Sequence, residues 1–121
     1  RQMCIRDSDT AAPLVRVVQP NIAQDQKWNP ELVPIHVARL LELTGQPVDG
    51  GGGAGPALTV WPETAVPWLL EDAAPILDAA ALAARGGALA VGVQRRGDGN
   101  LYYNSMVVLQ GSGTPLATYD K

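Results

Sequence analysis

The chain has 121 residues, which is about the size of one small domain. Apolar residues make up 46% of the chain and charged residues 17%, a balance typical of a globular protein and not of a disordered one. The formal net charge is −3, and the nine Lys and Arg residues are spread along the chain. Because binding to a phosphate backbone requires clustered positive charge, we exclude nucleic acid as a partner.

One cysteine, Cys4, and one histidine, His36, are present in the whole sequence. They cannot form an internal disulfide or a Cys/His metal site, so we predict no metal and no cofactor. No apolar run approaches the roughly 20 residues that cross a bilayer, and the N-terminus lacks the charged-then-apolar order of a signal peptide. We therefore predict no membrane span within these residues.

Two segments lack the periodic pattern of a helix or strand. Residues 1–12, "RQMCIRDSDTAA", are interpreted as a leader, either non-native or a native linker, which places the folded domain in residues 13–121. Residues 49–56, "DGGGGAGP", have the composition of a flexible surface connection.

The first half of the domain predicts one strand and one helix. "LVRVVQ" at residues 14–19 indicates a buried strand that stops at Pro20. Asn29 is suited to cap a helix that ends near Thr44. The apolar positions of that helix follow a helical spacing at Val33, Val37, Leu40 and Leu41.

The second half predicts strands around a second helix. An Ala-rich helix follows Asp72, with Leu77, Ala80, Ala81 and Ala84 on one face. Strands are expected at residues 57–61, 88–94, 101–110 and 115–121, with turns at 95–100 and 111–114. The order strand, helix, strand, helix, strand, strand, strand indicates an α/β or layered α+β class. We expect a mixed sheet with helices on one face, and a domain truncated after Lys121.

Glu63 is the first candidate for chemistry. It lies just past the carboxyl end of the strand at 57–61, where ligands bind in open α/β sheets. Pro62 restricts both its own backbone and that of Trp61, so the carboxylate is held in one direction and could act as a general base. The alternative is a structural acid that caps the following turn or pairs with an arginine.

Lys121 and Asn104 are further candidates. Lys121 ends the last predicted strand, where it is either a solvated edge residue or a cation that stabilises an oxyanion against Glu63. The sequence alone does not show that the two meet. Asn104 could turn its amide toward a site, or could be satisfied within the sheet.

Four separated segments together resemble one family. They are "VRVVQPNIAQDQKW" at 15–28, "LTVWPETAVPWLL" at 58–70, "LYYNSMVVL" at 101–109 and the final "YDK". This set resembles the carbon–nitrogen hydrolase (nitrilase) superfamily, and within it the apolipoprotein N-acyltransferase branch. The resemblance implies a four-layer αββα sandwich, of which this chain would be the N-terminal part.

The resemblance also implies a Glu, Lys and Cys triad. The triad Glu falls on Glu63, which follows Trp61 and Pro62, and the triad Lys falls on Lys121. The Cys of the family lies beyond the Lys and has no counterpart here, because Cys4 stands on the wrong side of Glu63. We therefore expect Glu63 as general base, Lys121 as the oxyanion-stabilising cation, and no acyl transfer by this chain alone.

The branch further implies partners and a location. Its acyl donor is a membrane phospholipid, its acceptor is an apolipoprotein, and the domain faces the periplasm from the bacterial inner membrane, held by transmembrane helices that flank it. Two other functions remain open: a soluble amidase with the same triad, and a non-catalytic binding domain of the same fold.

Overall fold

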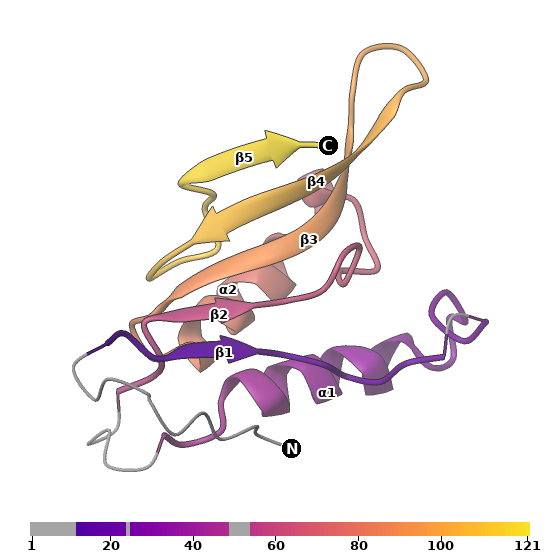
Figure 1. The fold of residues 1–121 in the computed structure, drawn as a ribbon. Coiled ribbons are helices and arrows are strands. Elements are labelled where there is room, and N and C mark those ends of the chain that lie inside the picture. The colour runs from indigo at the N-terminus through magenta and orange to yellow at the C-terminus, as the bar shows by residue number, and fades with distance from the viewer. Residues whose placement is uncertain (1–11, 24, 49–53) are drawn as a thin grey trace.

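The computed structural model describes residues 12–23, 25–48 and 54–121. In chain order its elements are β1 (Val15–Val17), α1 (Val33–Thr44), β2 (Leu58–Val60), the 3₁₀ helix η1 (Leu70–Asp72), α2 (Ala74–Ala83), β3 (Ala88–Arg96), β4 (Tyr102–Leu109) and β5 (Ala117–Asp120) (Figure 1). This order of strands and helices confirms the sequence prediction. Within the described residues, no helix has both the length and the apolar character needed to cross a bilayer.

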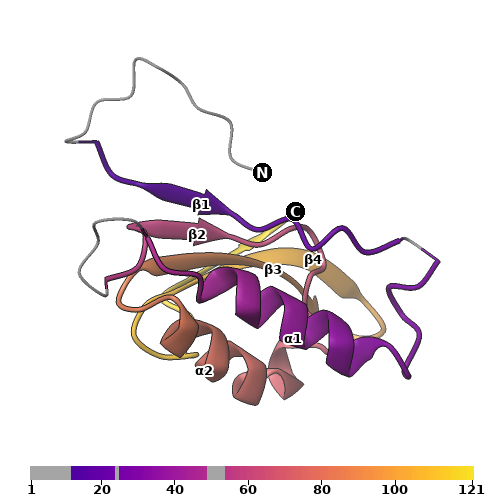
Figure 2. The same cartoon turned by 90° about the horizontal axis from the view of Figure 1, so that it is seen from below.

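The five strands form one mixed sheet in the order β1-β2-β3-β4-β5. The pairs β1-β2 and β2-β3 are parallel, because α1 and α2 serve as their crossover connections. The pairs β3-β4 and β4-β5 are antiparallel and follow one another as consecutive hairpins. Both helices lie on the same face of the sheet (Figure 2), as predicted.

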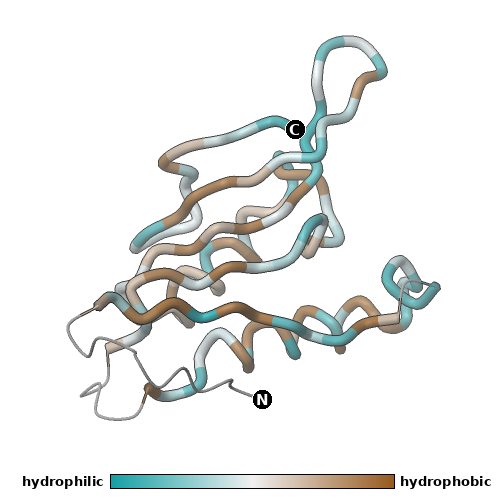
Figure 3. Tube along the Cα trace, in the orientation of Figure 1, coloured by the Kyte–Doolittle hydropathy of each residue, from teal (hydrophilic) through white to brown (hydrophobic). Residues whose placement is uncertain are grey.

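The core lies between this helical layer and the sheet. Its sheet side comes from alternate strand residues, because successive side chains point to opposite faces. These buried residues include Leu89, Val91, Val93, Val107 and Leu109. The helices contribute Leu40, Ile76, Leu77 and Ala80, and Ala84 follows directly after α2. Figure 3 shows apolar residues concentrated along the strands and alternating with polar residues along the helices.

A buried hydrogen-bond chain joins α1 to the sheet. The indole Nε1 of Trp61 donates to Thr44 Oγ1 at 2.8 Å, and Thr44 Oγ1 in turn donates to the carbonyl of Leu40 at 2.7 Å. Arg16 Nη1 donates to the carbonyl of Thr44 at 2.6 Å. A buried indole normally requires such a partner. The chain therefore fixes the C-terminal end of α1 against the end of β2 that leads to Glu63.

The opposite face of the sheet is apolar and exposed among the described residues. Val17 is 73% exposed, and Val15, Met106 and Tyr119 are also exposed. The prediction of a buried strand at residues 14–19 was therefore wrong in part: Val18 is buried, but Val15 and Val17 are not. The reason is that β1 is an edge strand, and the helices cover the other face of the sheet.

Two boundaries also differ from prediction. Asn29 does not cap α1, which begins at Val33 after Leu32 without a side-chain cap; Asn29 instead starts a turn by accepting from Glu31 N at 3.0 Å. Arg95 and Arg96 were predicted in a turn but belong to β3, because they pair with Tyr103 and Tyr102 of β4.

Part of the sequence predictions falls outside the described residues. The predicted leader, except for Ala12, and residues 49–53 of the glycine-rich segment lie there. The end of that segment is packed and is not a flexible connection. Pro56 is fully buried, and Gly55 N donates to the carbonyl of Arg85 at 3.2 Å.

Candidate functional site

Glu63 lies in a tight turn directly after β2. The turn is bound to β3 on both sides of Glu63: Trp61 N donates to the carbonyl of Ala90 at 2.8 Å, and Ala65 N donates to the carbonyl of Gly92 at 2.9 Å. Thr64 has a φ of 47°, which is strained for a β-branched residue. The backbone around Glu63 is therefore held in one conformation by the neighbouring strand.

Gly92 makes this close approach possible. A Cβ atom at position 92 would lie 2.3 Å from the carbonyl oxygen of Pro62 and 2.8 Å from the Cα atom of Glu63. No side chain fits there without moving the turn. A glycine inside a strand is the typical sequence signal of such an approach, and this signal was available at "AVGVQ".

Lys121 reaches Glu63 from the other half of the sheet. It follows β5, and its Nζ lies 3.4 Å from Glu63 Oε1 although the residues are 58 positions apart. The two side chains are 75% and 61% exposed, so the pair contributes little to stability. The structure thus brings together the two residues that the sequence singled out, and Glu63 pairs with a lysine and not with an arginine.

Asn104 of β4 connects both of them. Its side-chain Nδ2 donates to Glu63 Oε1, and its Oδ1 accepts from Thr64 Oγ1 at 3.1 Å. Its carbonyl accepts from the backbone N–H of Lys121 at 2.9 Å. The amide therefore turns toward the site, and the alternative of an Asn satisfied only within the sheet was wrong. Its O and N atoms are both used, which fixes their orientation.

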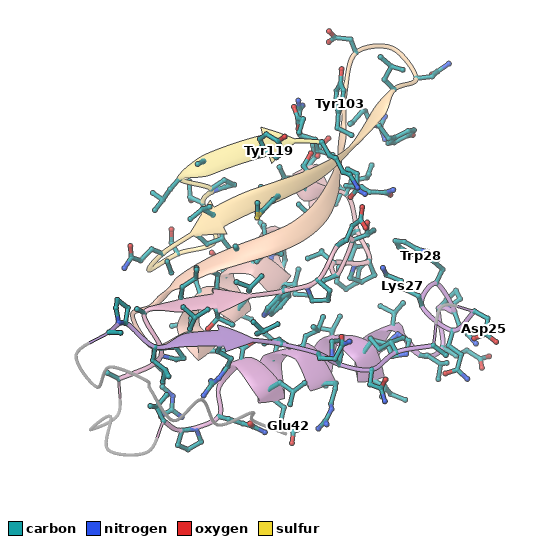
Figure 4. All side chains as sticks on the ribbon, viewed as in Figure 1. Asp25, Lys27, Trp28, Glu42, Tyr103 and Tyr119 are labelled. Atoms are coloured by element: carbon teal, nitrogen blue, oxygen red, sulfur yellow. The ribbon has the colours of Figure 1, made fainter. Side chains whose placement is uncertain are left out.

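A second lysine borders the site. Lys27 Nζ donates to the backbone carbonyl of Glu63 at 3.1 Å and lies 5.9 Å from the ring centre of Trp28. Figure 4 shows both residues on the loop between β1 and α1. Lys27 was not among the predicted site residues, because its distance in sequence from Glu63 gives no signal of contact.

A cavity of about 120 Å³ lies beside this turn. Apolar side chains such as Ile22 and Trp28 form much of its wall, together with Lys27, His36 and Thr64. His36 lies on α1 and lines this cavity. The cavity adjoins Glu63 through its neighbour Thr64.

Asp120, which directly precedes Lys121, is held by two side chains on the helix-covered face of the sheet. Arg95 forms a bidentate pair with it, with Nε at 2.6 Å from Asp120 Oδ1, and Ser105 Oγ donates to the same oxygen at 2.6 Å. The hydrogen bonds from Arg95 and then Ser105 lower the pKa of Asp120 from 3.8 to about 2. The carboxylate in turn raises the pKa of Arg95.

The site therefore combines an exposed carboxylate, an ammonium group and an amide donor at the carboxyl end of β2. A carboxylate can accept a proton, and an adjacent cation can stabilise a developing oxyanion. The catalytic roles of Glu63 and Lys121 remain predictions. Cys4 lies outside the described residues, and the sequence has no other cysteine.

The chain is similar in sequence to known acyltransferases. No protein-family model matches the chain. The chain is 37% identical over 120 residues to the apolipoprotein N-acyltransferase of Sinorhizobium medicae, which covers 93% of this chain and 22% of that protein. It is 40% identical over 111 residues to the apolipoprotein N-acyltransferase of Pseudomonas paraeruginosa, covering 84% and 20%. The chain thus spans about a fifth of the length of the curated relatives it matches.

Solved structures share the fold. An N-terminal amidase with an Asn-Glu-Ala peptide superposes with a TM-score of 0.62 at 18% identity, covering 90% of this chain and 28% of the amidase. A carbon–nitrogen hydrolase from Helicobacter pylori gives a TM-score of 0.60 at 20% identity, covering 90% and 39%. The mixed five-stranded sheet with two helices therefore matches part of the nitrilase-like fold, which confirms the predicted fold class.

Proposed function

We propose that this chain is a segment of an apolipoprotein N-acyltransferase and supplies two of its three catalytic residues. Its homology to such enzymes and its part of the nitrilase-like fold support this proposal. The observation that carries this proposal is the contact of Glu63 Oε1 with Lys121 Nζ at 3.4 Å. Two distant segments deliver a base and a cation to one end of a sheet, where ligands bind in open α/β folds.

Glu63 acts as the general base in this proposal. The nucleophile is a cysteine thiol from residues outside this chain, and its proton passes to Glu63. Oε1 already accepts from Asn104 and Lys121, so Oε2 is the oxygen that takes the proton. The thiolate attacks the carbonyl carbon of an acyl ester, and a carbon–sulfur bond forms.

Lys121 stabilises the oxyanion of the resulting tetrahedral intermediate. The ester carbon–oxygen bond then breaks, and Glu63 returns the proton to the departing alcohol. In a second step an amine attacks the thioester carbonyl carbon and loses a proton to Glu63. The carbon–sulfur bond breaks, and Glu63 returns the proton to the thiolate. The exchange is therefore ping-pong, with no net oxidation or reduction.

The substrates in this proposal are those of apolipoprotein N-acyltransferases. The donor is a membrane phospholipid, and the acceptor is the N-terminal amine of a diacylglyceryl-cysteine lipoprotein. The enzyme works at the bacterial inner membrane, with this domain on the periplasmic side. The homologous enzymes favour this reading over a soluble amidase, which is supported by fold alone.

The test uses the full-length protein that contains these residues. Glu63→Gln is expected to abolish the acyl-enzyme, measured as a thioester in a single turnover with a phospholipid donor. Glu42→Gln, on the exposed side of α1, is the matched control. A thioester that forms at the normal rate in Glu63→Gln overturns the general-base assignment. Rapid hydrolysis of an amide substrate, without transfer to an amine, indicates the amidase instead.

A further inference from the structure

The strand that delivers Lys121 has almost no apolar anchor. All four residues of β5 are exposed, and within the described residues only one strand, β4, pairs with it. Register is normally specified by burial of one face, and a strand without a buried face slips easily. A slip by one residue turns Lys121 to the wrong face, and a slip by two moves it by about 7 Å.

Asp120 specifies the register of β5 through polar contacts, whereas burial of apolar side chains does not specify it. In the observed register it lies opposite Ser105, whose side chain is buried and donates to Asp120 Oδ1 at 2.6 Å. Arg95, one strand further on, binds the same carboxylate through two nitrogens. A bidentate guanidinium–carboxylate pair is directional, so it is satisfied in one register only.

Arg95 is itself fixed in direction. Its guanidinium lies 4.7 Å from the ring centre of Tyr103, its partner on β4, and its Nη1 donates to the carbonyl of Arg96 at 3.4 Å. The three strands β3, β4 and β5 therefore each contribute one group to a single cluster around Asp120. Successive strand residues point to opposite faces, so Asp120 on the helix side directs Lys121 to the side of Glu63 and Asn104.

We propose that Arg95, Ser105 and Asp120 form a register pin that sets the pairing of β5 with β4 and thereby positions Lys121 beside Glu63. The importance of that position rests on the proposed function, whereas the register itself does not. Arg95, Ser105 and Asp120 are positioning residues, because they touch neither Glu63 nor Lys121 Nζ.

Disulfide formation between introduced cysteines measures the register directly. In a Cys4→Ser background of the 121-residue chain, Met106→Cys with Tyr119→Cys reports the native register, in which these residues face each other. Val108→Cys with Tyr119→Cys reports a slip by two residues, since this pair is diagonal in the native register and too far apart for a disulfide. Both positions of the native pair are exposed to oxidant.

Arg95→Gln and Asp120→Ala are expected to lower the ratio of native to slipped cross-link at least about five-fold, because the charge-assisted bonds are lost. Arg39→Gln, which removes an exposed ion pair of α1, leaves the ratio unchanged. An unchanged ratio in both pin variants overturns the proposal. If a pin variant unfolds by circular dichroism, the swap Arg95→Asp with Asp120→Arg decides: recovery of the 106–119 cross-link supports the pin, and continued loss overturns it.

Acyl transfer in the full-length protein separates the two proposals. If the cross-link ratio falls in Arg95→Gln and Asp120→Ala while Glu63→Gln still acylates normally, the register pin is supported and the proposed function is overturned. An unchanged ratio together with lost acylation in Glu63→Gln does the reverse.

Discussion

The backbone N–H of Lys121 donates to the carbonyl of Asn104 at 2.9 Å, and the side chain of that same asparagine donates to Glu63. Asn104 of β4 therefore binds both the backbone of Lys121 and the side-chain carboxylate of Glu63. Because both contacts start from one strand, β4 positions the backbone of Lys121 relative to the carboxylate of Glu63.

Asn104→Ala removes the amide that orients Glu63. We expect single-turnover acylation in the full-length protein to fall about ten- to hundred-fold, which is less than the roughly 10²–10⁴-fold that a general base supplies, because Glu63 itself remains. The backbone bond to Lys121 stays, so binding of the donor changes little. Asn100→Ala, in the exposed turn between β3 and β4, is the control. Normal acylation in Asn104→Ala contradicts the orienting role.

Gly92→Ala places a methyl group against the turn that carries Glu63. Overpacking of this kind costs about 1–3 kcal/mol of unfolding free energy, and the turn must move. We expect lower stability in urea denaturation and a loss of acylation in the full-length protein. Gly45→Ala is the matched control, because a Cβ there meets its nearest atom at an ordinary 3.4 Å. Equal behaviour of the two variants argues against a special role for Gly92.

Asp120 gives the chain an acid-dependent contact. Its pKa is lowered to about 2 in the fold from the ordinary 3.8 by Arg95 and Ser105. The folded state therefore binds this proton less readily than the unfolded state. The resulting stability is fully present above pH 3.8 and is lost as the pH falls through about 2. Tyr103 and Glu71 also contribute to the field at Arg95.

The measurement is an NMR titration of the Asp120 carboxyl carbon in the 121-residue chain. We expect a midpoint near 2 and a higher midpoint in Arg95→Gln. A midpoint that does not move in that variant shows that Arg95 is not the cause.

Trp61→Phe removes the indole donor to Thr44 and leaves the Thr44 hydroxyl with one partner fewer in the core. A lost buried hydrogen bond costs about 1–3 kcal/mol, so the unfolding free energy should fall by that amount. Trp68→Phe, at a half-exposed position, serves as the control. Equal losses in the two variants would mean that ring volume matters and the hydrogen bond does not.

The uncovered sheet face affects solubility. Val17, Met106 and Tyr119 expose apolar surface on one side of the sheet, and such surface promotes association. Val17→Thr with Tyr119→Thr is expected to raise the soluble yield of the 121-residue chain and to lower its binding of a hydrophobic dye. Leu82→Gln, on the exposed side of α2, is the comparison. An equal gain from Leu82→Gln indicates a general surface effect.

The sequence predicted the order of elements well, because apolar periodicity and the Gly and Pro positions are local signals. It placed Glu63 correctly at a strand end for the same reason. It missed the exposure of Val15 and Val17, because an apolar strand has the same sequence pattern at the edge of a sheet and at its centre. It also missed Arg95 as a strand residue, because two arginines before a glycine resemble a turn.

Local sequence patterns could not predict the contacts that assemble the site. Lys27 binds the carbonyl of Glu63 across 36 residues, and Asn104 binds its carboxylate across 41. No periodic signal marks such a pair in one sequence. The family resemblance implied catalytic roles for Glu63 and Lys121 but no role for Asn104 or Lys27, because their contacts depend on how separate segments pack.

Because the sheet mixes parallel and antiparallel pairs, the two halves of the site should form at different times during folding. Lys121 and Asn104 belong to the β3-β4-β5 meander, whose hairpins close between near neighbours in the chain. Glu63 joins only when β2 pairs with β3 in parallel across the α2 connection. Because local pairings form faster than non-local ones, the cationic half should form first. Formation of the Glu63–Lys121 contact would then report that the parallel and antiparallel parts of the sheet have docked.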